Sequence, residues 1–447
     1  MKQVIKFFVV AAAVAAGFTS CSSEEVIPNT PTTLERASLT IVLNNRDAAT
    51  KADGDGNAVA AETAIKSVSI FVFGAKPEAE KDTFFTIASS SSWSGQDGQY
   101  EATVKDLPVG SKQIYVGLNL PSALHADIKA NGISAAQTWA EADLGNLSSA
   151  TDGFPMFSDG TKPVGITLVK GNNEIEVSVK RLVAKVTVQN EKDFEDNLNG
   201  ERTANGMTID ANIQFALGQM NTKAYLFPRA SNVDPNYDGT NYLADFVNEH
   251  YDFKTNKDTW TESTSDVFKN FKAVTTSGDA TDITKHIPAY ALENTHALKR
   301  KGEMTYVAIK AKFTPQFIHS YTKPNLTATA NTANNLPKLY VFNDGGSFLY
   351  FTNKAEADSY ASDTNLGYET YNDCYSFYTV YLNPSDYNVL RNDYYAVAVE
   401  KIAKIGKPYP GATDPEEEMD AVAEIIVKIT VQNWHKVSQS TILGEKE

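Results

Sequence analysis

Cysteine is scarce in this sequence, and the side chains that usually build metal or catalytic sites are scattered. Only two cysteines occur in 447 residues, Cys21 and Cys374, so a disulfide framework is not expected. None of the six histidines stands at the short spacing to another histidine that zinc sites usually show. Glycine-rich phosphate loops and the glycine–serine elbow of hydrolases are also missing. We therefore expect no metal, no cofactor and no catalytic residues, although a site assembled from distant residues would leave no such motif.

Positive charge is also in short supply. The chain has 40 Lys and Arg against 55 Asp and Glu, a formal net charge of −15. This balance argues against nucleic acid and anionic membrane surfaces as partners. With 42% hydrophobic residues, the chain is long enough for two or three domains that each bury a core.

The N-terminus has the pattern of a targeting segment. Lys2 and Lys6 precede the apolar residues 7–18, and small polar residues lead to Cys21. The apolar run is shorter than the ~20 residues of a membrane span, so we expect anchoring by a lipid on Cys21. The alternative is an ordinary signal peptide followed by an incidental cysteine. Cys374 lies among aromatic residues and is interpreted as a packed thiol.

Short segments rich in β-branched and aromatic residues dominate the remaining sequence. One convincing helical stretch is expected, at residues 133–145. Residues 229–285 and 316–373 are rich in Asn, Asp, Thr, Ser and Tyr and predict long loops. Many short strands without regular helical crossovers predict an all-β chain with minor helix, built as β-sandwiches. The long strand run 173–190 is expected to end one domain and begin the next.

The first of these strands is joined to the body by an unusual connection. Leu39, Ile41 and Leu43 alternate with more polar residues, the pattern of a strand with one buried face. A loose linker follows, with Arg46 and Lys51 as sites for a protease that cuts after basic residues. Residues 53–57 match the first ligand positions of a calcium loop, but Ala58 and Ala64 replace the required Gly and Glu. We interpret them as a hydrated turn and predict that residues 37–43 are removed by proteolysis.

The C-terminal segment alternates in the same way as the first strand. Its apolar positions are Ile425, Val427, Ile429 and Val431, continuing to Trp434, Val437 and Leu443. If a sheet loses its first strand, such a segment of another subunit could fill the groove by strand addition. Burying five apolar side chains would contribute roughly 8–15 kcal/mol as an upper bound, before association costs. Because this head-to-tail contact does not close on itself, it predicts a filament. Alternatively, residues 423–443 are simply the last strands of their own domain.

Three segments resemble a known family. They are "VKRLVAKVTV" (179–188), "YNVLRNDYYAVAVEKIAKIGKPYPG" (387–411) and "IIVKITVQNWHKVSQ" (425–439). Together with the lipoprotein signal, they resemble the fimbrillins of the Bacteroidales, subunits of type V pili. The acidic "SSEE" after Cys21 resembles the signal that sends lipoproteins of these bacteria to the cell surface.

The resemblance implies two transthyretin-like β-sandwich domains with Greek-key character. It implies a lipidated, palmitate-bearing precursor at the outer membrane, an arginine- or lysine-specific maturation protease, and strand exchange through the C-terminal arm. The segment after Lys51 resembles a mature N-terminus more than the segment after Arg46, and both sites are kept. Arg181 and Arg391 match family positions and are interpreted as structural residues that pair locally or snorkel. The expected organisation is a signal peptide (1–20), a removed segment (21–51), two sandwiches (52–185 and 186–422) and a donor arm (423–447).

The predicted function is that of a structural subunit of a surface fimbria that supports adhesion and biofilm formation. Its partners would be copies of itself, other fimbrial subunits, the maturation protease and a surface receptor. One alternative is an accessory or tip adhesin that binds host glycans or proteins through residues 316–373. Another is a monomeric surface lipoprotein that binds glycan through aromatic side chains.

Overall fold

A computed structural model describes the body of the chain. The chain divides into the units Met1–Glu35 and Arg36–Glu447, and the described residues all lie in the second unit. They are residues 36–44, 62, 65–74, 83–88, 99–121, 138–140, 153–160, 163–190, 206–221, 223–237, 246–247, 271–274, 287–333, 335–402, 404–411, 432–433 and 438–443. Within these ranges no helix has the length and apolar character needed to cross a membrane.

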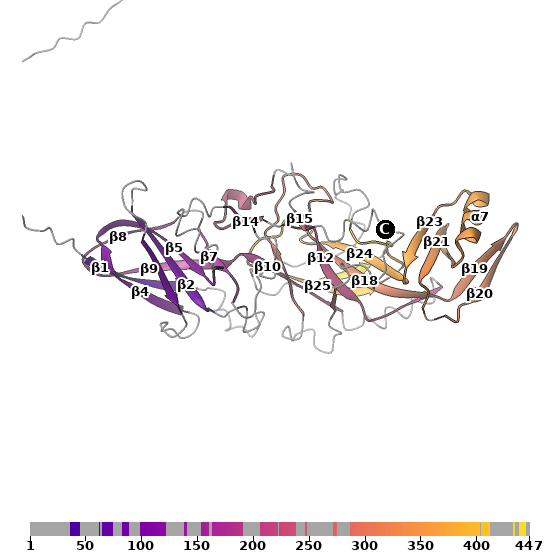
Figure 1. Cartoon of the computed structure of the whole chain (residues 1–447), viewed down its shortest axis with the longest axis horizontal. Coiled ribbons are helices and arrows are strands. Elements are labelled where there is room, and N and C mark those ends of the chain that lie inside the picture. Colours follow the sequence, from indigo (N-terminus) through magenta and orange to yellow (C-terminus); the bar gives the residue numbers. More distant parts are fainter. Residues whose placement is uncertain are drawn as a thin grey trace, which may run out of the picture. The chain divides into compact units, whose positions relative to one another are not determined.

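The N-terminal half forms one curled sheet in the order β3-β2-β5-β7-β9-β1-β4, with β8 paired to β5 (Figure 1). Its strands are β1 (Arg36–Asn44), β2 (Ser67–Gly74), β3 (Thr83–Ala88), β4 (Gln99–Pro108), β5 (Gly110–Leu118), β7 (Met156–Ser158), β8 (Val164–Leu168) and β9 (Gly171–Arg181). Apolar residues of β1, β4 and β9 share one buried cluster with those of β2, β5 and β8. The two halves of the sheet therefore enclose a common core, which we call the first core.

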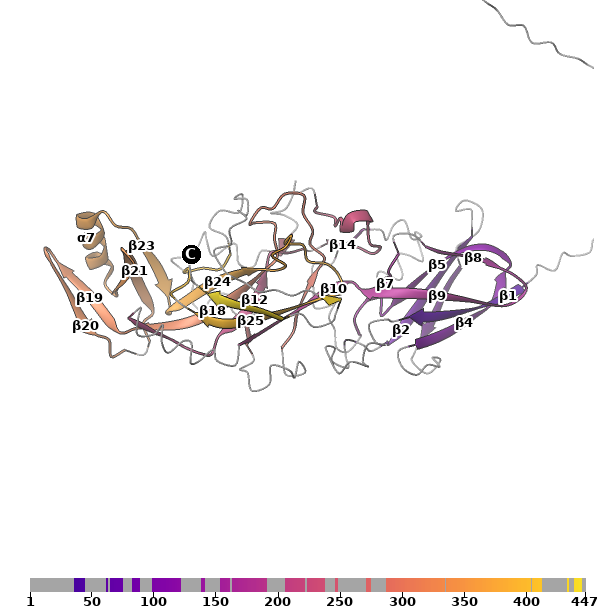
Figure 2. The same ribbon diagram turned by 180° about the vertical axis from the view of Figure 1, so that it is seen from behind.

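A second sandwich follows, beginning with β10 (Val183–Asn190), which is separated from β9 by Leu182 alone. One sheet has the order β17-β10-β25-β26 with β27 paired to β25, and the other has the order β11-β18-β12-β16 with β24 paired to β18 (Figure 2). The first sheet comprises β10, β17 (Ala289–Leu292), β25 (Asp393–Ile402), β26 (Gln432–Asn433) and β27 (Ser438–Leu443). The second comprises β11 (Met207–Ile209), β12 (Gln214–Gly218), β16 (Lys272–Ala273), β18 (Tyr306–Pro315) and β24 (Tyr375–Tyr381).

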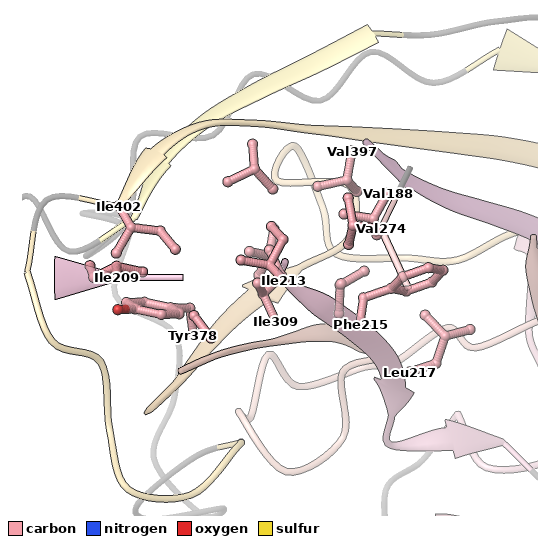
Figure 3. Packing of buried hydrophobic residues seen from close by; sticks show 14 of the residues in the cluster. Val188, Ile209, Ile213, Phe215, Leu217, Val274, Ile309, Tyr378, Val397 and Ile402 are labelled. Atoms are coloured by element: carbon pink, nitrogen blue, oxygen red, sulfur yellow. The ribbon is translucent and has the colours of Figure 1, made fainter. Parts of the chain in front are cut away.

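Alternating apolar residues of these two sheets fill the space between them. Figure 3 shows Val188 and Val397 from one sheet opposite Phe215 and Ile309 from the other. All four side chains are at most 1% exposed. A strand that presents every second side chain to the interior produces this packing, so the alternation read from the sequence corresponds to a real core.

Two small ladders accompany the sandwiches. β6 (Thr138–Ala140) pairs with β14 (Lys223–Tyr225), and β13 (Met220–Asn221) pairs with β15 (Phe246–Val247). A short 3₁₀ helix occupies Ala230–Asn232. The helix predicted at 133–145 is wrong at Thr138–Ala140, which pair as a strand, while its other residues lie outside the described ones. Pairing with a distant strand overrides weak local helix propensity here, as Thr and Trp favour strands.

Residues 316–373 are not the long loop that their composition predicts. They form a hairpin of β19 (Phe317–Thr322) and β20 (Asn325–Ala330), a sheet of β21 (Lys338–Asp344), β22 (Ser347–Phe351) and β23 (Tyr368–Asn372), and helix α7 (Lys354–Thr364). The aromatic residues that suggested a decorated loop build a small core. Phe342, which is fully buried, packs edge-on against Phe351 and Tyr360 at ring-centroid distances of 5.3 and 5.0 Å. Asn353 caps α7 by accepting a hydrogen bond from Ala355 N.

The predicted all-β fold with minor helix is confirmed, because strands dominate the described part of the chain and α7 adds a short helix. The residue limits given above for the domains stay a proposal.

We expect Phe342→Ala to lower the free energy of unfolding by about 3–5 kcal/mol, because it leaves a cavity between two aromatic rings. Urea titration followed by circular dichroism measures this change. Phe317→Ala is the matched control, since Phe317 is 47% exposed and its loss should cost less than about 1 kcal/mol. Equal effects of the two substitutions would contradict the assigned core.

Candidate functional site

The first strand, β1, is an interior strand of its sheet. It pairs antiparallel with β4, from Arg36 opposite Pro108 to Asn44 opposite Gln99. On its other side it pairs in parallel with β9, from Ala37 opposite Gly171 to Asn44 opposite Ser178. Removing β1 would therefore leave two unpaired strand edges that face each other across a gap one strand wide.

One face of β1 is embedded in the first core. Leu39, Ile41 and Leu43 are fully buried, and Ala37 is 3% exposed. Ala102 and Val104 of β4 and Val177 of β9 belong to the same cluster, so they would line the gap. Burial of the three large side chains contributes roughly 5–9 kcal/mol before the cost of ordering the strand. The gap is therefore an apolar groove that requires an occupant.

The opposite face of β1 is mostly polar, and its side chains join the strand to both neighbours. The Ser38 hydroxyl donates to Asn172 Oδ1 at 2.9 Å, and the hydroxyls of Thr40 and Thr103 lie 3.0 Å apart. Arg36 Nη1 donates to the carbonyl oxygen of Asp106 at 2.9 Å. These exposed contacts set the register of β1, while the apolar face supplies most of the stabilisation.

The structure places Leu443 of the predicted donor arm, in β27. This strand runs parallel to β25, with Ser438 opposite Ala396 and Leu443 opposite Ile402. In the described part of the chain β27 pairs with β25 alone. The other predicted donor residues, Ile425, Val427, Ile429, Val431, Trp434 and Val437, lie outside the described residues, as do Cys21, Arg46 and Lys51.

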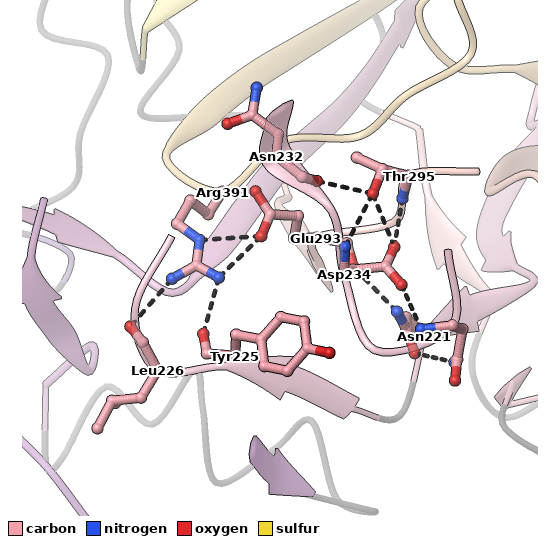
Figure 4. A network of polar contacts seen from close by, with 9 residues as sticks. Asn221, Tyr225, Leu226, Asn232, Asp234, Glu293, Thr295 and Arg391 are labelled. Atoms are coloured by element: carbon pink, nitrogen blue, oxygen red, sulfur yellow. Dashed lines mark hydrogen bonds and ion pairs between the residues drawn. The ribbon is translucent and has the colours of Figure 1, made fainter. Parts of the chain in front are cut away.

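Arg391 is buried in a polar cluster of the second sandwich (Figure 4). Its guanidinium forms an ion pair with Glu293 at 2.8 Å and donates to the carbonyl oxygens of Leu226 and Tyr225. Arg181 is also buried, and it donates to Asn392 Oδ1 and to the carbonyl oxygen of Glu62. Both arginines pair with residues distant in sequence, so they neither snorkel nor pair locally. Their contacts tie chain segments together, which suits a structural role.

Asp234 lies in the same cluster and is almost completely buried. Its carboxylate accepts hydrogen bonds from the backbone N–H groups of Thr295 and Asn236. Burial raises the pKa of this carboxyl to about 6, against the opposing effect of these hydrogen bonds. The described residues contain no group of three His, Cys, Asp or Glu that could hold a metal ion. The hydrogen bonds of Asp234 therefore join the loops that carry Asn236 and Thr295.

Cys374 is buried, and its thiol donates to the carbonyl oxygen of Leu336 at 3.3 Å. Burial raises the pKa of the thiol to about 11, so it is unreactive near neutral pH. This position agrees with the interpretation of Cys374 as a packed thiol.

The walls of the groove were not identified from the sequence as functional. The run 173–190, which contains β9, is predicted as strand because it alternates, but alternation does not name a pairing partner. That β1 lies between β4 and β9 depends on pairings across more than 50 residues of sequence on one side and more than 130 on the other.

Two family models match the chain on either side of its middle. Residues 37–210 match the model of the major fimbrial subunit protein FimA. Residues 350–440 match that of the major fimbrial subunit protein type IV, fimbrillin, C-terminal part. These matches define the chain as a fimbrial subunit with a structural role in a cell-surface fimbria. It belongs to the fimbrillin family.

Several solved structures match the chain at low identity. A fimbrilin, FimA, from Porphyromonas gingivalis is 13% identical with a TM-score of 0.45, covering 92% of this chain and 98% of its own. The tip fimbrial protein Mfa3 of the same organism, with a C-terminal truncation, is 12% identical with a TM-score of 0.37, covering 81% and 94%. A fimbrial assembly protein from Parabacteroides distasonis is 12% identical with a TM-score of 0.33, covering 66% and 99%. No curated protein sequence matches the chain.

We expect Ile41→Ala to lower the free energy of unfolding of the uncleaved protein by about 2–5 kcal/mol, because the side chain is fully buried in the first core. Thr40→Ala, one residue earlier on the polar face, should cost less than about 1 kcal/mol. Denaturant titration of both variants measures the difference. Similar losses would show that β1 is not held by its apolar face.

We expect Asp234 to titrate with a midpoint near pH 6 in the folded protein. Because the pKa rises on folding, the stability that this group contributes is fully present below about pH 4 and is lost as the pH rises through 6. The loss amounts to about 3 kcal/mol. Carbon-13 NMR of aspartate carboxyls measures the midpoint. Asp358 is an internal control, because a hydrogen bond from Tyr368 and the ammonium of Lys354 lower the pKa of its carboxyl. A midpoint of Asp234 below pH 4 would contradict the expectation.

Proposed function

We propose that this fimbrillin is a polymerising subunit that is exported as a lipoprotein, cleaved after β1 and assembled by donor-strand exchange. Lipidation of Cys21 would hold the precursor at the outer membrane until the linker is cut and β1 dissociates. The observation that carries the proposal is the interior position of β1 between β4 and β9. A strand at that position closes the groove in the precursor, and its loss creates a site for a strand from another subunit.

The apolar faces of the outgoing and incoming strands match in number and spacing. β1 buries four side chains at alternate positions, Ala37, Leu39, Ile41 and Leu43. The C-terminal arm offers four at the same spacing, Ile425, Val427, Ile429 and Val431. A donor with this pattern would restore the apolar contacts, and its backbone would restore both hydrogen-bond ladders. The arm also contains β27, whose pairing with β25 alone means that one described ladder has to break to release it.

The position of β1 also bears on the choice between the two cleavage sites. β1 ends at Asn44, only two residues before Arg46. A protease that binds several residues before the cut would have to pull Leu43 and Asn44 out of their ladders to reach Arg46. Lys51 lies seven residues beyond the end of β1 and avoids this cost. The structure therefore supports Lys51, the site also favoured by resemblance.

A second candidate function is that of an accessory or tip adhesin. The observation that favours it is the hairpin of β19 and β20, where Phe317 and Leu326 are 47% and 40% exposed. Such side chains could contact a receptor. A tip subunit would accept a donor strand but would not donate one, so the behaviour of the C-terminal arm distinguishes the two roles.

We expect limited trypsin digestion of the soluble precursor to cut after Lys51, more slowly after Arg46, and to be followed by filaments visible in the electron microscope. Mass spectrometry of the new N-terminus identifies the site. Deleting residues 423–447 should leave the cut unchanged and abolish filaments, because the groove then has no donor. The double variant Arg46→Ala, Lys51→Ala should remain uncut and monomeric.

Filaments formed by the uncleaved double variant would overturn the proposal, because β1 would then not block assembly. A cut protein that releases β1 and stays monomeric would favour the tip adhesin.

A further inference from the structure

A third basic residue lies between the first two strands. Residues 45–66 contain Arg46, Lys51 and Lys66, and the Lys66 side chain is exposed immediately before β2. A protease that cuts after basic residues therefore meets three sites in one connection. Which of the three bonds is cut is a separate question, and its answer rests on the maturation proposed above.

The backbone at Lys66 is held by Asn119, which follows β5. The N–H groups of Lys66 and Ser67 both donate to Asn119 Oδ1, at 2.7 and 3.2 Å. Asn119 N donates to the carbonyl oxygen of Ser67 at 3.0 Å, and its side-chain amide donates to the carbonyl oxygen of Phe154 at 3.0 Å. Asn119 is 5% exposed and has a φ of 53°, a conformation that Asn adopts more readily than most residues. The Lys66–Ser67 peptide bond is thus fixed on both sides.

The chain just before Lys66 is fixed by two further side chains. Ile65 is buried in the first core. Glu62 is fully buried, and its carboxylate pairs with Lys185 Nζ at 2.8 Å and accepts a hydrogen bond from the Tyr290 hydroxyl at 2.6 Å. Arg181 Nε donates to the carbonyl oxygen of Glu62 at 3.1 Å. Lys185 and Tyr290 belong to strands β10 and β17 of the second sandwich, so Glu62 joins the segment before β2 to that sandwich.

Proteolysis requires several residues on each side of the cut to leave the folded structure and lie extended in the protease. At Lys66 this opening would break the three hydrogen bonds to Asn119, expose Ile65 and withdraw Glu62. Withdrawal of Glu62 would leave the Lys185 ammonium buried without the carboxylate that now pairs with it, a costly state.

We propose that Glu62 and Asn119 set the C-terminal limit of the cleavable linker and protect the Lys66–Ser67 bond from the maturation protease. They are positioning residues that act on the choice of cleavage site. A cut after Lys66 would remove Glu62 together with the linker and damage the second sandwich. Protection of this bond confines processing to Arg46 and Lys51, upstream of the anchored segment.

Time-resolved trypsin digestion of the full precursor, with mass spectrometry of every new N-terminus, tests this proposal. The variants are Asn119→Gly, which keeps the backbone conformation but lacks the amide, and Glu62→Gln, which removes the charge. Cleavage after Lys66 should rise on the order of tenfold or more in both, with cleavage after Lys51 unchanged. Asn119→Asp separates the two roles of the side chain, because its carboxylate still accepts from Lys66 and Ser67 but no longer donates to Phe154, and it should raise cleavage after Lys66 less than Asn119→Gly does.

Rapid cleavage of the native protein after Lys66, or no increase in either variant, would overturn the proposal. So would an increase matched by new cuts at the buried Lys185 and Lys310, since these cuts report global unfolding. A different result would separate the two proposals. If the native protein resists trypsin at Arg46 and Lys51 while the variants become sensitive at Lys66, protection of Lys66 by Glu62 and Asn119 is supported and the proposed maturation is contradicted.

Discussion

The two hydrogen-bond ladders of β1 are the constraint on which the rest of the structure depends. An edge strand can be lost with one set of backbone groups exposed to water, but an interior strand leaves two sets facing a narrow gap. The first core also requires a strand at this position, because Leu39, Ile41 and Leu43 form one wall of it. The N-terminal half is therefore complete only when a strand occupies this position. That strand need not come from the same chain, which is the basis of the strand exchange proposed above.

Much of the fold could be predicted because period-2 alternation reports a buried strand face directly. Residues 39–43 and 173–190 show this, and each overlaps strands of the structure. The failures have a common cause. At Thr138–Ala140 and throughout residues 316–373, structure depends on partners that local composition does not name. Tyr and Phe scattered among polar residues predict a loop when each segment is taken alone. In the folded chain Phe342, Phe351 and Tyr360 pack into one buried cluster.

The candidate site likewise has features that the sequence predicts and features that it does not. The apolar face of β1 was predictable residue by residue, whereas its position between β4 and β9 was not. The apolar flanks of Arg181 predict local pairing or snorkelling, but its side chain is buried and contacts residues distant in sequence. Glu62, Asn392 and Glu293 are distant in sequence from the basic residues they contact. Buried ion pairs contribute little net stability, but breaking one is costly. Such pairs therefore determine which chain segments lie together, and they add little to the free energy of unfolding.

The double pairing of β1 also has a consequence for timing. A cut in the linker breaks one peptide bond and leaves both ladders and the buried face of β1 intact. The severed strand would remain in place as a non-covalent plug, and its departure would be governed by dissociation or by stepwise displacement from one end. Proteolysis and growth would then be separate events with a lag between them. A cell could accumulate cut, plugged subunits, and the incoming strand, more than the protease, would set the pace of fimbria growth.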